Sequence, residues 1–439
     1  MTIPTMDSSD SKILGFSTGS YPLALSSLIE EMSLKQRSNL IFLETRLHEL
    51  WGLGQNVILN WCPERDGITI LAVPHYSVAT YANEISSDAT DATDEIQGAR
   101  PSEDFFKMLI SERRRLTPRQ MKNVATLLGI ERTYLPLRTR LTDSAREEQL
   151  VEQMIKRYSI SYVANRAVAL FDIVGFSLSS PFEQMTQLNS LSYSVNSAQS
   201  KLLAKKIGID FGRSTTGDGF YLWNRDLGLN ADINLYHFMH LVLADNAIAR
   251  SKGVRNTVPE LRAAFHIGSS YEFHQAEGLN PTIYNYIVGD VTVELARMID
   301  RALPGQILVG EFSAKAPSGD GALANEVMLD STEFVVKAAE GLQQLSGLEL
   351  SGEKIESIQC YLTGTRLESG GFSVRRISIY DKHGFSRNVF NAKVNIYRRH
   401  ADPILLGIED RTLAAEPAST PAAAASEPDS LPDHAGKRS

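Results

Sequence analysis

Apolar positions follow a helical spacing in some stretches of the chain and a strand spacing in others. In residues 26–50 they recur every three or four positions, which predicts an amphipathic helix. The runs NVILNW and GITILAVPHY come next, and their β-branched and apolar residues predict two strands. Residues 85–98, ISSDATDATDEIQG, are typical of an acidic linker. Residues 102–160 then predict helices with a break at Pro118.

Strands and helices alternate regularly from about residue 160. The strand RAVALFDIV precedes a long helix that starts at Pro181 and ends by Gly208. The strands IDFGRSTT and GFYLWN follow, joined by a tight turn at Gly217-Asp218, and lead to a second long helix, INLYHFMHLVLADNAIARSKG. The strand LRAAFHIGSSYEF completes the order β-α-β-β-α-β, which is the split βαβ (ferredoxin-like) arrangement. A helix, VTVELARMIDRA, and a strand, GQILVG, come after it. We therefore expect an α+β fold.

The remaining parts of the chain have weaker patterns. Residues 316–370 give a mixed signal, whereas residues 373–397 predict a hairpin of two β-rich runs around Asp381-Lys382-His383-Gly384. Both ends of the chain are polar or Ala-, Pro- and Ser-rich without periodicity, which predicts disorder. The predicted division is 1–19 disordered, 20–159 an N-terminal α/β extension, 160–315 the split βαβ domain, 316–411 a C-terminal region with the hairpin, and 412–439 a disordered tail.

Composition narrows the class of protein. The 439 residues are 43% hydrophobic and 22% charged, as in soluble globular proteins, and the length suits two or three domains. A net charge of −8 favours no broad basic face, so we expect no nucleic-acid partner. The two distant cysteines, Cys62 and Cys360, indicate neither a disulfide framework nor a zinc site, which fits a reducing cytosol. Neither a leader peptide nor a membrane-length apolar run is indicated, so we expect a cytoplasmic protein with no membrane partner.

Asp172 stands out because it lies near the end of an apolar strand, in ALFDIVGFSLSS. One interpretation is a carboxylate that caps the next helix. The other involves Asp218, at the tip of the hairpin STTGDGFYLW. In a split βαβ sheet the first strand lies centrally beside this hairpin, so the two carboxylates can converge, and they repel each other unless a cation lies between them. Hard divalent ions, with water and substrate phosphates as further ligands, suit such a site.

The segment around Asp172 also has features of a phosphate cradle. Gly175 allows close approach, and the helix after it can offer N–H groups to phosphate oxygens. The carbonyl oxygen of Ile173 is a candidate additional metal ligand. The residues of this segment expected to contact a nucleotide are Phe171, Ile173, Val174, Gly175 and Phe176.

The segments FDIVGFS, TGDGFYL, LRAAFHIG and VGDVTVELARM…PGQILV, in this order, resemble the catalytic domain of class III nucleotidyl cyclases. The resemblance implies a homodimer with composite sites, in which Asp172 and Asp218 hold two Mn²⁺ or Mg²⁺ ions. It implies that a ribose 3′-hydroxyl attacks the α-phosphorus, releasing pyrophosphate and closing a 3′,5′-cyclic ring. It also implies that Arg297 reaches the site from the opposite subunit and stabilises transition-state charge. A surface ion pair of Arg297 with Glu294 or Asp300 is the alternative.

Three positions depart from the family pattern. The family has an asparagine one helical turn before the arginine, and here that position is Val293, which cannot hydrogen-bond a ribose. The positions of the family's lysine and aspartate purine readers are Ser214 and Tyr286. A bulky ring would shrink a purine-sized pocket, and a hydroxyl can address a pyrimidine edge. Packing of Tyr286 against Tyr284 and Phe273 is the alternative.

This pattern resembles the pyrimidine cyclases of bacterial anti-phage defence, the Pycsar systems, and YDKHGFSRNVFNAKVNIY resembles their small C-terminal sensor domain. The resemblance implies a uridylate cyclase that converts UTP to cyclic UMP, with CTP as the alternative substrate. It implies that the product activates a separate effector in abortive infection. Two other hypotheses stay open: an adenylate or guanylate cyclase with divergent base contacts, and an inactive nucleotide-binding homologue, which Val293 motivates.

Two further features have simpler interpretations. His266, within the strand AAFHIG, is expected to be a packed side chain rather than a catalytic base. The run ERRR at 112–115 is expected to form a solvated helix face.

Overall fold

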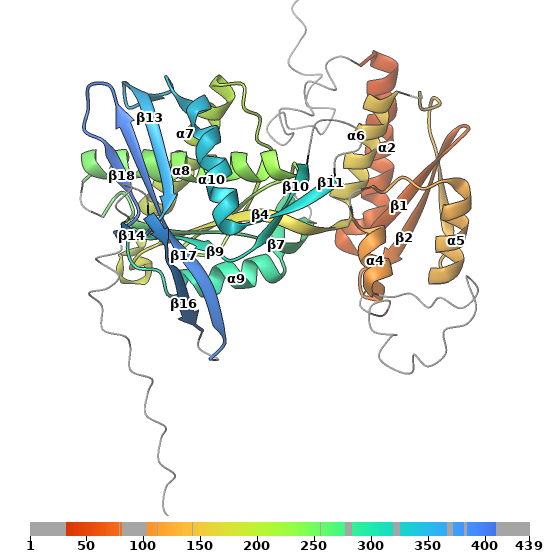
Figure 1. The fold of residues 1–439 in the computed structure, drawn as a ribbon. Coiled ribbons are helices and arrows are strands. Elements are labelled where there is room, and N and C mark those ends of the chain that lie inside the picture. The colour runs from red at the N-terminus through yellow and green to blue at the C-terminus, as the bar shows by residue number, and fades with distance from the viewer. Residues whose placement is uncertain are drawn as a thin grey trace, which may run out of the picture.

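The structure is a computed structural model that describes most of the chain between residues 32 and 409 (Figure 1). The predicted disordered ends, 1–19 and 412–439, and the predicted linker, 85–98, lie outside the described residues. The described ranges are 32–78, 80, 103–111, 113–142, 144–254, 256–276, 283–318, 325–366, 372–381 and 384–409.

The N-terminal part is a three-layer unit around a small antiparallel sheet of order β1-β2-β3. The two faces of this sheet form two apolar clusters, one with α2 and α6 and the other with α4 and α5. Because both faces are covered, β1 is buried almost throughout instead of alternating. Its elements are α2 (Leu34–Trp51), η1 (Gly52–Gly54), β1 (Asn56–Glu64), β2 (Gly67–Pro74), α4 (Glu103–Leu109), α5 (Pro118–Leu128), β3 (Arg132–Pro136) and α6 (Ala145–Arg157).

One expectation for this part is confirmed and another needs correction. The helical segment is interrupted before Pro118, as expected: α4 ends at Leu109 and α5 begins at Pro118, which occupies its first turn after a capping box of Thr117 and Gln120. Residues 102–160 are not all helical, since β3 lies among them and completes the sheet beside β2. The strands expected at NVILNW and GITILAVPHY are confirmed as β1 and β2.

The middle part has the expected order β-α-β-β-α-β, which confirms the split βαβ arrangement within an α+β fold. The first strand, β4, lies centrally between β6 and β7, as expected. A strand that the sequence pattern did not predict, β8, pairs with the end of β7. The elements are β4 (Ile160–Ile173), η2 (Phe176–Leu178), α7 (Pro181–Ala204), β5 (Phe211–Thr215), β6 (Gly219–Asn224), α8 (Leu229–Lys252), β7 (Leu261–Ala276), β8 (Ile283–Val288), α9 (Asp290–Ile299) and β9 (Ile307–Gly310).

The C-terminal part adds strands to this same sheet. β17 pairs antiparallel with β9, and also with β13, β16 and β18, which extends the sheet of the middle part to 11 described strands. The pairs β10–β11 and β14–β15 are separate two-stranded sheets. The expected hairpin at 373–397 is confirmed as the pair β16–β17. The elements are β10 (Ser313–Ser318), β11 (Asn325–Asp330), α10 (Ser331–Gly341), η3 (Leu342–Leu345), β12 (Glu349–Leu350), β13 (Glu353–Leu362), β14 (Gly364–Arg366), β15 (Phe372–Val374), β16 (Arg376–Tyr380), β17 (Ser386–Arg398) and β18 (Ile404–Leu406).

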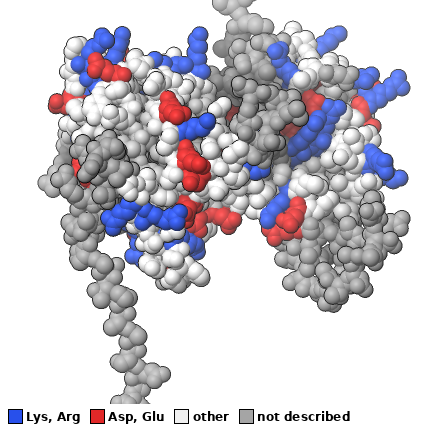
Figure 2. All heavy atoms as spheres, viewed as in Figure 1, with Lys and Arg blue, Asp and Glu red and all other residues white. Residues whose placement is uncertain are grey.

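Helices cover both faces of the large sheet. α7, α8 and α10 lie on one face and share the largest apolar cluster, while α9 lies on the other face (Figure 1). The smaller cluster under α9 includes Val168 and Leu170 of β4, so successive β4 side chains alternate between the two cores. On the face seen in Figure 2, basic and acidic side chains of the described residues are interspersed. No helix in the described ranges is long and apolar enough to span a membrane.

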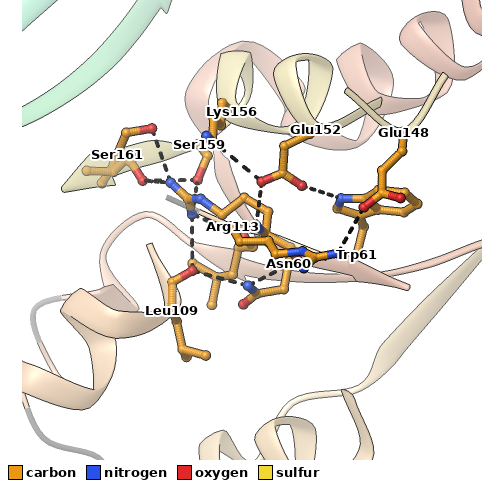
Figure 3. A network of polar contacts seen from close by, with 12 residues as sticks. Asn60, Trp61, Leu109, Arg113, Glu148, Glu152, Lys156, Ser159 and Ser161 are labelled. Atoms are coloured by element: carbon orange, nitrogen blue, oxygen red, sulfur yellow. Dashed lines mark hydrogen bonds and ion pairs between the residues drawn. The ribbon is translucent and has the colours of Figure 1, made fainter. Parts of the chain in front are cut away.

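The run ERRR does not form a solvated helix face, because Arg114 is fully buried in the segment after α4. Its guanidinium donates to the carbonyl oxygens of Leu59 (3.1 Å) and Ile160 (2.6 Å) and to the hydroxyls of Ser159 and Ser161. Its main-chain N–H donates to Glu152, which also accepts from Trp61 (Figure 3). This network joins the N-terminal unit to the first residues of β4.

Candidate active site

Asp172 occupies the penultimate position of β4, where its side chain is only 6% exposed. It lies opposite Gly219 of β6 and Arg262 of β7 in the strand register. The Nε–H of Arg262 donates to Asp172 Oδ2 over 2.6 Å. Asp172 caps no helix, since Gly175 precedes the next turn and Ser180 caps α7. The capping interpretation is therefore wrong, and the carboxylate lies at an edge of the sheet beside a guanidinium.

Asp218 lies in the turn between β5 and β6, next to the end of β4. The main-chain N–H of Ile173 donates to the carbonyl oxygen of Asp218 over 3.0 Å, so a hydrogen bond joins the turn to the residue after Asp172. Gly217 has φ +99°, a conformation that suits glycine and lets the chain reverse here. The Thr216 hydroxyl donates to Asp218 Oδ1 over 3.3 Å and restrains the carboxylate. The structure thus brings the two predicted aspartates to neighbouring positions.

The electrostatics of Asp172 show a balance of opposing effects. Burial is the largest influence and raises its pKa, and the carboxylates of Asp218 and Asp300 raise it further. The hydrogen bond and charge of Arg262 act in the opposite direction and favour the ionised form. Two further carboxylates therefore act on Asp172, which has one guanidinium beside it, and an added cation would relieve their repulsion.

The donor set fits a hard divalent ion. Oxygen atoms of Asp172 and Asp218 are the type of ligand that Mg²⁺ and Mn²⁺ take, and such ions complete their shells with water and phosphate oxygens. No group of three or more His, Cys, Asp or Glu side chains in the described part of the chain could hold a metal by itself. An ion at these aspartates would therefore depend on a phosphate-bearing ligand for part of its coordination.

The segment after Asp172 differs from the expected cradle at the start of a long helix. Gly175, with φ +66°, leads into η2, a single 3-10 turn, and α7 begins only at Pro181 with its own capping box. Leu178 and Ser179 donate their N–H groups back into this turn. The N–H groups of Phe176 and Ser177 lie at the start of this turn. The turn's own hydrogen bonds do not use them. Any phosphate contact here would come from that short turn.

The expected nucleotide contacts around Asp172 divide into buried and accessible residues. The side chain of Phe171 has no exposed surface and packs in the main core, so its side chain cannot touch a ligand, which corrects that expectation. Ile173 is 2% exposed, which leaves only its main chain for the predicted metal contact. Val174 and Phe176 are half-buried and Gly175 is exposed, so these three remain candidates.

The two predicted base readers lie on strands that approach each other. Cα atoms of β5, which carries Ser214, come within 8 Å of Cα atoms of β8, which carries Tyr286. Tyr286 stacks on Phe273 of β7, with the ring centroids 5.4 Å apart and the planes 15° apart. Its side chain is still 39% exposed. The packing alternative for Tyr286 is therefore realised with Phe273, and its exposed part stays available; the side chain of Tyr284 lies outside the described residues.

Arg297 lies on α9 and is not joined to the two aspartates by any described contact. Its Nη1 lies 3.7 Å from Glu294 Oε1, which realises one of the surface ion pairs considered from the sequence. Its Nε lies 3.3 Å from Oδ2 of Asp381, in the turn of the C-terminal hairpin. Val293, one turn earlier on the same helix, is 45% exposed.

Sequence reasoning missed Arg262 as a component of the site. The signal was present, because Arg262 starts the strand LRAAFHIG and strand pairing places it directly beside Asp172. Its Nη1 also donates to the Ala302 carbonyl over 3.0 Å, which fixes the side chain. His266, by contrast, is buried against Phe312 with a pKa lowered by burial to about 4, as expected for a packed residue.

Comparisons with known proteins gave structural similarities only. No protein-family model and no curated protein sequence matches the chain. The guanylate cyclase domain of RhGC from Catenaria anguillulae, in complex with GTP, aligns with 54% of this chain and 99% of its own, at 12% identity and a TM-score of 0.32. The guanylyl cyclase Cya2 aligns with 53% of this chain and 92% of its own, at 11% identity and a TM-score of 0.30. The adenylyl cyclase CyaB from P. aeruginosa aligns with 56% of this chain and 100% of its own, at 14% identity and a TM-score of 0.29.

About half of this chain is thus similar to nucleotidyl cyclases of known structure, at low identity and low TM-score. These similarities assign neither a substrate nor an activity to this chain.

Proposed function

We propose that this chain is a metal-dependent nucleotidyl cyclase that closes a nucleoside triphosphate to its 3′,5′-cyclic monophosphate and releases pyrophosphate. The single observation that supports this most strongly is the juxtaposition of Asp172 and Asp218, fastened by the hydrogen bond from Ile173 to the Asp218 carbonyl. Two carboxylates held together at the accessible end of a rigid sheet favour a divalent cation and, through it, a polyphosphate. When bound, such ions would polarise the attacking hydroxyl and neutralise phosphate charge.

The protein residues have separate roles in this proposal. Asp172 and Asp218 hold the two ions, and the carbonyl oxygen of Ile173 supplements them. Arg262 favours the ionised form of Asp172 against the larger effect of burial, and its hydrogen bond holds the carboxylate in one orientation. Arg297, supplied by a second copy of the chain, stabilises charge that develops on the transferring phosphate. The composite site therefore requires a homodimer.

We further propose a pyrimidine triphosphate as substrate, with UTP preferred to CTP. Ser214 occupies the position of the family's lysine and is too short to reach a base in the same way. Tyr286 occupies the position of the family's aspartate and presents an aromatic ring in place of a carboxylate that would hydrogen-bond a purine. The stacked pair of Tyr286 and Phe273 adds bulk to that wall. In the biological setting that the sequence resemblance implies, the cyclic nucleotide is a messenger of anti-phage defence that activates a separate effector.

The test is to incubate the purified full-length chain with each of the four ribonucleoside triphosphates and Mn²⁺, and to identify the product by mass. We expect cyclic UMP as the main product. Dominant cyclic AMP or cyclic GMP would reject the substrate assignment but keep the cyclase. No cyclic product from any of the four would reject the enzyme and favour the inactive nucleotide-binding hypothesis that Val293 motivates.

Substitution of the metal ligands tests the site itself. Asp172→Ala and Asp218→Ala should each reduce turnover to background, because either change removes half of the protein's carboxylate ligands. Chelation of the metal should have the same effect on the unmodified chain. The matched control is Glu49→Gln, which removes an exposed ion pair with Arg46 on α2 and should leave turnover unchanged. Turnover retained in either aspartate variant would contradict the assignment.

A further inference from the structure

The turn of the C-terminal hairpin places a buried carboxylate against α9. The side chain of Asp381 is only 5% exposed. Its Oδ1 accepts the main-chain N–H of Phe385 over 3.0 Å, which closes the turn and fixes the carboxylate. Its Oδ2 lies 3.3 Å from the Nε of Arg297. A carboxylate with one oxygen held by its own turn thus directs the other at the guanidinium that the proposed function requires.

A second ion pair connects the same two elements. Arg387 of β17 lies 2.5 Å from Glu294 Oε2, measured from its Nε. Glu294 is also the neighbour of Arg297 on α9, with Oε1 3.7 Å from Nη1. Glu294 and Arg297 of α9 therefore each meet an opposite charge of the hairpin. This reciprocal arrangement fixes the hairpin relative to α9 in both position and direction.

Apolar contacts hold the hairpin where these charges meet. Val389 of β17 belongs to the buried cluster under α9, and Ile377 and Ile379 of β16 pack against it. Leu295 and Met298 of α9 are members of the same cluster. Because β17 also pairs with β9, the hairpin is continuous with the sheet that carries Asp172. Asp381 therefore directly follows a strand, β16, that these contacts hold against α9.

We infer that Asp381 is a positioning residue for Arg297, so that the C-terminal hairpin forms part of the catalytic unit. This inference rests on the proposed function, in which Arg297 acts on a phosphate. A free arginine side chain has four rotatable bonds, and a carboxylate against one edge of the planar guanidinium restricts them. Asp381 lies at Nε and Glu294 at Nη1, so two carboxylates restrict the orientation of the guanidinium. Arg297 then presents its remaining N–H donors to a phosphate oxygen in a fixed orientation.

The test is a double-mutant cycle on the full-length dimeric enzyme with the nucleoside triphosphate that it turns over. Asp381→Asn keeps an acceptor for the Phe385 N–H and removes the charge that orients Arg297. We expect kcat to fall about 10-fold to 100-fold, as for other residues that orient a functional group, with KM changed less than about twofold. Asp381→Glu should restore part of kcat. Arg297→Ala should lower kcat at least as much, and adding Asp381→Asn to it should cause no further loss.

Control variants separate positioning from general loss of structure. Glu311→Gln breaks an ion pair with Arg376 of the same hairpin, 2.6 Å in length, without touching α9, and should leave kcat unchanged. Asp381→Asn and Glu311→Gln should both stay folded at the assay temperature, as judged by thermal unfolding. An unchanged kcat in Asp381→Asn, or losses that multiply in the double variant, would overturn the positioning role while Asp172→Ala stays inactive. If Asp172→Ala stays active, the proposed function fails, and the positioning role fails with it.

Discussion

At the scale of single residues, several histidine side chains are buried, where a charged imidazole would be unfavourable. His240 of α8 is 1% exposed, packs edge-on against Tyr236 with ring centroids 4.3 Å apart, and neither of its ring nitrogens has a hydrogen-bond partner within the described chain. Burial lowers its pKa to about 3. Burial also lowers the pKa of His237 and of His266 to about 4. All three therefore stay neutral in the folded protein across the physiological range.

These three histidines predict that acid destabilises the fold. Between pH 6.5 and about 4 the unfolded chain binds protons at these imidazoles and the folded chain does not, so stability is lost as the pH falls. Asp232 acts in the opposite direction, because burial raises its pKa to about 7 and its contribution is lost as the pH rises towards that value. Burial also lowers the pKa of His274 to about 4, so four histidines outweigh Asp232. We therefore expect the free energy of unfolding, measured in urea, to fall from pH 7 to pH 5.

His240→Phe tests the origin of this dependence. A phenyl ring of similar size leaves no unpaired nitrogen and cannot be protonated, so the variant should lose stability less steeply between pH 7 and pH 5. At pH 8, where the imidazole is neutral in both states, its stability should lie within about 1.5 kcal/mol of the parent, as for a volume-conserving exchange. Parallel pH profiles for variant and parent would contradict this explanation.

The sequence indicated some site residues because local pattern and strand order sufficed for them. Asp172 and Asp218 could be paired once the split βαβ order was recognised, since that order fixes which strands are neighbours. The second partner of Arg297, Asp381, could not be found in this way, because the hairpin that carries it joins the sheet through the pairing of β17 with β9. Arg114 was misread because charge patterns assume exposure, and its burial depends on carbonyl groups from three separate segments of the chain.

At the scale of elements, long segments were predictable and short ones were not. α7 and α8 each have 24 residues, with no glycine and with no proline after the first residue, which favours a helix over that length. β3 has 5 residues and a single buried position, so it carries too little pattern to be distinguished from the helices around it. β8 gains its place from pairing with β7 rather than from its own sequence. α7 begins at Pro181 as expected, because the Ser180 capping box sets its start, and the short η2 turn, which was not predicted, lies between Gly175 and that cap.

The approach of β6 to β4 gives a prediction at this scale. A Cβ atom at Gly219 would lie 1.9 Å from the carbonyl oxygen of Phe171, so only glycine permits the register that brings Asp218 beside Asp172. We expect Gly219→Ala to lower the free energy of unfolding by about 1–3 kcal/mol and to reduce turnover together with it. The matched control is Gly208→Ala, where a Cβ meets nothing within 4 Å, and it should be neutral or slightly stabilising. Equal stabilities for the two variants would contradict the steric reason.

At the scale of the whole molecule, two extensions are attached to the split βαβ core in different ways. The C-terminal part continues the core sheet through β17, with main-chain pairing from Val389 to Ala392. The N-terminal unit has its own sheet and meets the core where β4 begins, with Ile58 donating to Tyr158 and Tyr162 donating to Ile110. Neither attachment could be predicted from hydrophobic periodicity, because each depends on contacts between segments far apart in the sequence.

Arg114 is the residue on which the N-terminal attachment should depend most. Burial lowers its pKa to about 9, so it is still a cation at neutral pH, and its guanidinium bonds residues on both sides of the junction. Arg114→Met keeps the length of the side chain but leaves the carbonyls of Leu59 and Ile160 without this donor. We expect it to cost about 3–5 kcal/mol of stability, the usual penalty for breaking a buried charged network. Thermal unfolding and limited proteolysis should show the N-terminal unit opening first.

The neighbouring arginine provides the control that distinguishes this role from a general effect of charge. Arg113 is 72% exposed and pairs with Glu148 over 3.1 Å, so Arg113→Gln should change stability by less than about 1 kcal/mol. The two substitutions each remove one positive charge from the same run of three arginines, and they differ mainly in burial. Because the junction lies at the start of β4 and the aspartates at its other end, Arg114→Met should leave turnover nearly unchanged at temperatures where the chain stays folded. Equal effects of the two variants on stability would show that the buried network does not hold the N-terminal unit to the core.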